Sequence, residues 1–224
     1  MSVFQAVPRS LLRVAVGMMV GMVLAAFFAT GALILDRQAT GPWATRYAEA
    51  VPLPAARVGK RFVLYRDVMQ RWETVDRFLA IEEGRAPAGQ VLRTRTELRQ
   101  EAYEQLIRET HLAALAEEQA FTVPPEVIEA NIQHLLAQAS TTVGVVEGAA
   151  QEASVPTVQE LSDYLLATFG WTFDEFRERI LVPALREEGL AQRMMTTNGT
   201  TLDAWRADVD TFLRSEQVKR YLQF

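Results

Sequence analysis

Hydrophobic and polar positions divide the chain into an uncharged N-terminal stretch and a longer part with helical periodicity. Val14 to Leu35 holds no charged residue over about 22 positions, which at 1.5 Å per residue gives about 33 Å, enough to cross a bilayer. Arg9 and Arg13 precede it, and a basic flank favours the cytoplasmic side. The pattern predicts a transmembrane signal anchor (14–35) in the cell membrane, a cytoplasmic N-terminus (1–13) and an extracytoplasmic C-terminal part.

A cleaved signal peptide is the alternative interpretation of the same stretch. The apolar core of a signal peptide is usually about 7 to 15 residues long and ends at a small-residue cleavage site. Neither feature is clear in this sequence, so we favour the anchor.

The rest of the chain is expected to be a linker followed by one folded domain. Residues 36–56 contain three prolines and no sustained period, which predicts a linker. The domain then spans residues 57–224. Arg57 to Leu64 favours β-structure with a turn at Gly59-Lys60, and the C-terminal QVKRYLQF offers Val218, Tyr221 and Phe224 for a short edge strand.

Apolar residues at helical spacing predict a series of helices between these two β segments. The first inward stripes are Val68, Trp72, Val75 and Leu79; then Leu98, Ala102, Leu106, Ala113 and Ala116; then Ile128, Ile132, Leu135 and Ala139. The second helix spans residues 92–119. Pro124 and Pro125 separate it from the third, because a proline ends one helix and is well tolerated in the first turn of another. We expect these two helices to form an αα-hairpin.

Two capping boxes mark further helix starts. Thr157 with Glu160, and Thr172 with Glu175, fit the capping-box pattern. In this pattern the threonine hydroxyl accepts the backbone N–H of the glutamate, and the glutamate carboxylate accepts the backbone N–H of the threonine. The inward residues expected in these helices and in a last helix after Asn198-Gly199 are Val158, Leu161, Leu165 and Phe169; Phe173, Phe176, Ile180 and Ala184; and Leu202, Trp205, Val209 and Phe212. The fold class expected is therefore mainly α, with a small terminal β element.

Two segments interrupt the regular pattern. Residues 139–156 are small and nearly uncharged, which favours a mobile loop over a buried strand at Val143 to Val146. Pro183 lies inside a predicted helix, where it must free the carbonyl of Arg179 and bend the axis. The bend either shapes a groove or follows the curve of the core, and we favour the second.

Composition and charge exclude several classes of function. The chain has no cysteine, which excludes disulfides and thiolate metal sites. Residues 37–224 contain 21 basic and 27 acidic residues, a net charge of −6. Phosphate backbones need clustered Lys and Arg, so we expect no nucleic-acid partner.

Candidate chemistry is sparse, and we expect no enzyme activity, no cofactor, no metal and no catalytic residue. His111 and His134 are the only histidines, and neither has a second ligand at i+4. The neighbouring pairs Glu117/Glu118 and Glu187/Glu188 do not face each other on a helix. Phosphate-binding and nucleophile-elbow motifs are absent from the sequence. A hydrolase built from scattered residues stays open as an alternative.

Apolar and aromatic bulk is the remaining candidate for a binding site. The residues concerned are Phe169, Trp171, Phe173, Phe176, Met194 and Met195. Most residues at this spacing belong to a core, but methionine also recurs on surfaces that accept varied partners. Some of this set is therefore a candidate for binding unfolded polypeptides.

Three stretches of the chain are ARVGKRFVLYRDVMQRW, EAYEQLIRETHLAALAEEQAFTVPPEVIEANI and FGWTFDEFRERILVPALREEGL. Together they resemble the N-terminal chaperone domain of the SurA, PpiD and PrsA group of extracytoplasmic foldases. ARVGKRFVLYRDVMQRW resembles the opening strand and first helix of the family, although Val58-Gly59 lacks the family's asparagine. EAYEQLIRETHLAALAEEQAFTVPPEVIEANI is similar to the family hairpin. FGWTFDEFRERILVPALREEGL is similar to a later family helix, through Gly170, Thr172, Glu175, Phe176, Arg177 and Ile180.

The resemblance implies an ATP-independent holdase for unfolded or nascent secreted and envelope polypeptides, tethered to the membrane. It also implies that the terminal β segments pair, Arg61 to Leu64 with Val218 to Phe224. Many relatives insert a parvulin-type prolyl isomerase domain, whose motifs are missing here, so no isomerase activity is expected. The alternative is a scaffold or assembly subunit for one dedicated membrane or envelope partner. Exchange of terminal strands leaves a homodimer open.

Overall fold

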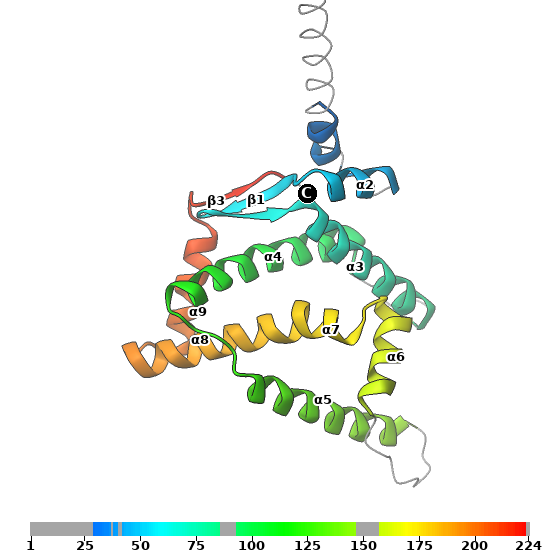
Figure 1. The fold of residues 1–224 in the computed structure, drawn as a ribbon, viewed down its shortest axis with the longest axis vertical. Coiled ribbons are helices and arrows are strands. Elements are labelled where there is room, and N and C mark those ends of the chain that lie inside the picture. Colours follow the sequence, from blue (N-terminus) through cyan, green and yellow to red (C-terminus); the bar gives the residue numbers. More distant parts are fainter. Residues whose placement is uncertain (1–28, 37, 40–41, 86–92, 147–156, 223–224) are drawn as a thin grey trace, which may run out of the picture.

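A three-stranded antiparallel sheet lies at one end of the molecule, and helices cover one of its faces (Figure 1). This computed structural model describes residues 29–36, 38–39, 42–85, 93–146 and 157–222. The prediction of a mainly helical chain with a small β element is confirmed. After a helical segment at 29–36, the elements are α2 (Pro42–Ala50), β1 (Pro54–Val58), β2 (Arg61–Leu64), α3 (Tyr65–Arg85), α4 (Arg95–Glu118), α5 (Pro125–Val146), α6 (Val158–Phe169), α7 (Phe173–Phe176), the π-helical turn η1 (Arg177–Leu181), α8 (Val182–Asn198), α9 (Leu202–Leu213) and β3 (Val218–Arg220).

β1 is the central strand of the sheet, with β2 on one side and β3 on the other. Gly59 forms the β1–β2 turn with a φ of 58°, a conformation that glycine adopts readily. The predicted pairing of the C-terminal strand with Arg61–Leu64 is wrong, because β3 pairs with β1. The tight turn pairs β2 with one edge of β1, and the C-terminal residues occupy the other edge.

The largest buried side chains lie between the sheet, α3 and α4. Tyr65, Trp72 and Tyr103 are almost fully buried. Trp72 donates its indole N–H to the carbonyl of Arg99 at 3.0 Å, and the Tyr103 hydroxyl donates to the carbonyl of Ala55 at 2.7 Å. The polar end of each of these two rings therefore keeps a hydrogen bond inside the core, as buried Trp and Tyr usually require.

α4 is buried on more than one side, which the apolar stripe did not predict. Of the five residues expected to face inward, Ala116 alone is buried; the others are partly exposed. Tyr103 and Ile107 belong to the core under the sheet, whereas Leu112 packs with α8 and α9. A helix with neighbours on several sides has no single inward face.

The αα-hairpin expected for α4 and α5 is wrong. Ile128, Ile132 and Leu136 of α5 pack against Leu181 and Leu185 of η1 and α8. Other residues of α8 pack against α4 and α9. α8 thus carries apolar residues on two sides, one packed on α4 and the other on α5. The chain from η1 through α8 lies between α4 and α5 (Figure 1).

The structure also differs from the linker expected at residues 36–56. α2 forms within it, and Ala44 and Ala48 are buried on one side of that helix. Ile34, from the preceding helical segment, has no exposed surface and belongs to the same core. The Tyr65 hydroxyl donates to the carbonyl of Ala39 at 3.1 Å. Alanines at i and i+4 give α2 a small apolar face, which packs closely on the domain.

Both predicted capping boxes are confirmed, at Thr157 and at Thr172. The same motif begins α4, where Thr94 and Glu97 satisfy each other's backbone amides. Gly199 ends α8 with a φ of 65°, as the Asn-Gly pair predicts. Helix boundaries in this chain therefore follow local signals.

Two predictions fall partly outside the described residues. α5 continues to Val146, so neither a loop nor a strand is correct for residues 139–146, and residues 147–156 lie outside the description. The predicted membrane span at 14–35 lies mostly outside it as well. Among the residues that are described, no helix combines the length and apolarity that crossing a bilayer requires.

Candidate functional site

A groove of about 560 Å³ opens between the α4–α5 connection, α5 and α8. We call it the α5–α8 groove. Its apolar lining consists of Phe121, Val123, Pro124, Val127 and Leu185. Its polar lining consists of Asn131, Glu188, Gln192, Arg193, Thr196 and Thr197. An apolar surface with polar groups around it is the usual form of a site that binds largely hydrophobic ligands.

The α4–α5 connection builds one wall of this groove. Ala120 has a φ of 48°, which turns the chain sharply after α4, and Phe121 donates its amide to the carbonyl of Ala116 at 2.7 Å. The Phe121 ring then lies against Gly189 of α8, where an added Cβ would come within 2.3 Å of it. Glycine at this position therefore allows the connection to pack closely on α8.

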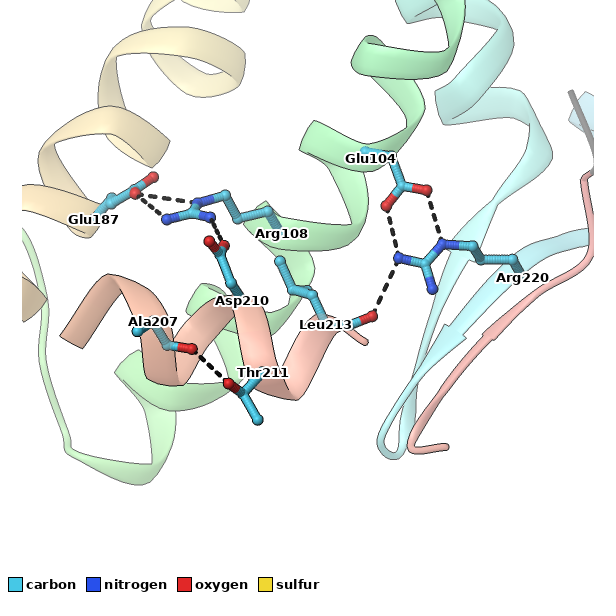
Figure 2. Close-up of polar contacts among 8 residues, drawn as sticks. All are labelled: Glu104, Arg108, Glu187, Ala207, Asp210, Thr211, Leu213 and Arg220. Atoms are coloured by element: carbon cyan, nitrogen blue, oxygen red, sulfur yellow. Dashed lines mark hydrogen bonds and ion pairs between the residues drawn. The ribbon is translucent and has the colours of Figure 1, made fainter. Parts of the chain in front are cut away.

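Ion pairs from α4 fix α8, α9 and β3 in place (Figure 2). Arg108 donates to Glu187 of α8 at 2.8 Å and to Asp210 of α9 at 3.0 Å. Arg220 of β3 donates to both carboxylate oxygens of Glu104, at 2.7 and 2.8 Å. Paired, bidentate arginine contacts of this kind give geometric specificity. They hold the α8 side of the groove on the sheet-bearing part of the domain.

A second polar contact joins α3, α4 and the π-helical turn. Pro183 has no amide to offer the carbonyl of Arg179, as the sequence predicts. Arg71 donates to that carbonyl at 3.2 Å and to Glu109 at 2.9 Å. Burial raises the pKa of Glu109, and the neighbouring Arg71 opposes that rise. The freed carbonyl therefore attaches the π-helical turn η1 to α3.

Further exposed apolar side chains lie on α6, on more than one side of the helix. Leu165 is buried, whereas Val158, Tyr164 and Leu166 are 41%, 52% and 56% exposed. The Arg77 guanidinium from α3 lies against Gly170 at the end of α6, a favourable place for a cation at a helix C-terminus. We call the three exposed side chains the α6 surface.

The six predicted client-binding residues do not form one surface. Phe169 and Trp171 lie together, with ring centroids 6.1 Å apart, and Trp171 is buried. Phe173 and Phe176 are partly buried against the core of α5 and α8. Met194 of α8 packs in the cluster that α8 forms with α4 and α9, and Met195 is partly exposed. Their role in binding stays a prediction, and these positions account mainly for packing.

Sequence reasoning missed the groove because its walls come from segments far apart in the chain. Val127 precedes the inward stripe residue Ile128 by one position, so its 41% exposure follows from helical periodicity. No local signal identifies Phe121 as the residue that packs on Gly189. A helical glycine in REEGLAQ is the one hint that another element approaches closely.

The two histidines lie in different helices and have different partners. His111 is buried and stacks on Phe212, with ring centroids 3.7 Å apart. His134 lies on the surface of α5, and its Nε2 is 2.8 Å from the amide of Gln138. Within the described parts of the chain, His, Asp and Glu nowhere gather into a group of three able to hold a metal ion.

Comparison with known proteins gives one match. The model of the SurA-like N-terminal domain family matches residues 3–139, which is more than half of the 224 residues. The matched part includes β1, β2, α3, α4 and the groove residues Phe121 to Asn131. No curated protein and no solved structure matches the chain.

Proposed function

Because the chain belongs to the SurA-like N-terminal domain family, we propose that it is a holdase that binds unfolded polypeptides in the α5–α8 groove. Membership of this family indicates a chaperone-like role. The clients are unfolded or nascent secreted and envelope polypeptides. The chain acts by binding alone, without ATP, cofactor or covalent chemistry.

The observation that carries this proposal is the form of the α5–α8 groove. Phe121, Val127 and Leu185 offer apolar area, which attracts any apolar side chain without directional requirements. Polar side chains at the rim, such as Asn131 and Gln192, are suited to hydrogen bonds with an extended backbone. A site of this kind binds many sequences weakly rather than one sequence tightly.

Tethering to the membrane is the second part of the proposal. The uncharged stretch Val14 to Leu35 and the preceding arginines support a single span with the N-terminus inside. Residues 29–36 and α2 pack on the domain through Ile34, Ala44 and Ala48. The domain would then sit directly at the outer surface of the membrane, where newly translocated chains emerge.

The experiment measures light scattering from a chemically unfolded test protein, with and without the full chain in nanodiscs. We expect suppression of aggregation at near-stoichiometric ratios. Val127→Gln should weaken the suppression. Val158→Gln is the matched control, because Val158 is also 41% exposed and also lies in the first turn of a helix.

Each outcome decides between interpretations. Suppression that Val127→Gln weakens and Val158→Gln preserves supports the groove. Suppression that Val158→Gln weakens and Val127→Gln preserves indicates that clients bind at the α6 surface instead. Unchanged aggregation with the wild-type chain contradicts the holdase and favours a scaffold for one dedicated partner.

A further inference from the structure

The outer face of the sheet carries a row of exposed basic and aromatic side chains. Arg57 of β1 lies opposite Phe62 of β2 and opposite Lys219 of β3. Directly opposed residues in an antiparallel sheet share a face, and all three are exposed. α3 and α4 cover the other face (Figure 1). Tyr221, two residues after Lys219, is 41% exposed.

The N-terminal segment approaches this same end of the molecule in a fixed position. Residues 29–36 lie on the side of the sheet that α3 and α4 leave uncovered (Figure 1). Ile34 is fully buried there, and its carbonyl accepts the amide of Ala39 at 3.1 Å. Leu33, next to Ile34 in the sequence, and Trp43 of α2 are 45% and 52% exposed. The packing therefore fixes which face of the domain follows the predicted membrane span.

The net charge of the sheet and α2 is opposite in sign to that of the rest of the domain. Residues 36–66 and 214–224, which include the sheet and α2, contain nine basic and three acidic residues, a net charge of +6. Residues 67–213 contain 12 basic and 25 acidic residues, a net charge of −13. Both lysines of the chain, Lys60 and Lys219, lie at the sheet. An anionic surface attracts this end of the domain and repels the rest.

We propose that the outer face of the sheet, with Trp43 of α2, rests on the anionic headgroups of the membrane that anchors the chain. Arg57, Lys60 and Lys219 bind the headgroups, and Trp43, Phe62 and Tyr221 enter the interfacial region that aromatic side chains favour. α5 lies at the opposite end of the molecule (Figure 1), so the part of the α5–α8 groove that α5 forms lies away from the bilayer, where clients can reach it.

Other occupants of this face fit the observations less well. A second copy of the chain placed symmetrically on it would bring two positively charged faces together, which like-charge repulsion opposes. An acidic protein partner would match the charge. In that case the face would stay exposed to water in vesicles that contain the chain alone, whatever their lipid, and the experiment below detects this. The proposal rests on the proposed membrane tether.

The test uses single-cysteine variants of the full chain, which has no native cysteine. A nitroxide label at Gln217→Cys reports on the sheet, and one at Ala130→Cys reports on α5; both positions are exposed. The chain is reconstituted into vesicles of phosphatidylcholine alone or with phosphatidylglycerol. Contact is measured as protection of the label from a water-soluble relaxing agent.

We expect protection at residue 217 in vesicles with phosphatidylglycerol, weak protection in phosphatidylcholine alone, and none at residue 130. Each basic residue near an anionic surface strengthens binding about fivefold, so the variant Arg57→Glu, Lys60→Glu, Lys219→Glu should weaken docking by at least on the order of 100-fold. Charge reversal at Arg177 and Arg206, which are exposed elsewhere on the domain, should leave docking unchanged.

A water-exposed label at residue 217 in both lipids overturns the proposal, and so does protection that is equal in both or survives the triple reversal. Resistance of the chain to alkaline extraction tests the tether separately. Inserted chains with an exposed label refute the sheet contact alone. Chains that fail to insert but show lipid-dependent protection refute the tether and leave the contact standing. The light-scattering assay reports on the holdase independently of both.

Discussion

Protonation of His111 should destabilise the folded domain in mildly acidic solution. The side chain is buried and stacks on Phe212, with interplanar angle 9° and ring centroids 3.7 Å apart. Burial, helped by the nearby Arg108, lowers the pKa of His111 from 6.5 to about 4. The folded state therefore keeps the neutral imidazole at a pH where the unfolded chain has already bound a proton.

The sign and size of the effect follow from this difference. Between pH 6.5 and pH 4 the unfolded chain binds the extra proton, so stability falls as the pH falls. One pKa unit corresponds to about 1.4 kcal/mol, which gives a loss of about 2 kcal/mol at pH 5 and about 3 kcal/mol once the pH is below 4. The capping carboxylates of Glu97, Glu160 and Glu175 have lowered pKa values, so they stay largely ionised at pH 5. Glu109, whose pKa is raised by burial, acts in the opposite direction.

The assay compares urea unfolding at pH 7 and pH 5 for residues 29–224 and for the variant His111→Phe. The variant keeps an aromatic ring against Phe212 and cannot titrate. We expect it to lose most of the pH dependence, and the imidazole signals of His111 in NMR spectra to titrate well below pH 6. A His111 pKa near 6.5, or an unchanged pH dependence in the variant, would refute the reasoning.

Three further predictions concern stability. Arg71→Met leaves the buried Glu109 carboxylate without its partner and should lower the free energy of unfolding by about 3 kcal/mol; adding Glu109→Gln should recover part of the loss, measured by urea unfolding. Gly189→Ala places a methyl group against the Phe121 ring and should cost about 1 to 3 kcal/mol, with a matching loss of client binding. A chain that begins at residue 37 lacks Ile34, which is fully buried, and should be about 2 kcal/mol less stable than one that begins at residue 29; equal melting temperatures would contradict that packing.

Local signals in the sequence predicted most helix boundaries. Thr157 and Thr172 each begin a helix with the expected capping box, and Pro124 and Pro125 start α5 after the break that they require. Pro183 has no amide to donate to the carbonyl of Arg179, as the sequence predicts. The hydrogen bond that this carbonyl accepts comes from Arg71, 108 positions away, and depends on the tertiary fold.

Tertiary arrangement was predicted less well, for reasons visible in particular residues. α4 packs in two separate apolar clusters, so the single stripe through Leu98 and Ala102 does not give its buried face. Ala44 and Ala48 are too small to produce a conspicuous apolar pattern, so the sequence alone does not distinguish α2 from a linker. The α5–α8 groove requires Phe121 to meet Gly189, a contact that no spacing rule encodes.

Photocrosslinking from residue 127 tests the central claim most directly. A photoreactive amino acid replaces Val127 in the full chain, with the same replacement at Val158 as the control, and each variant is illuminated with a test protein in its unfolded or its native state. The account predicts adducts from residue 127 with the unfolded protein, few with the native protein, and few from residue 158. Absence of adducts from residue 127, or equal yields with native and unfolded protein, would contradict it.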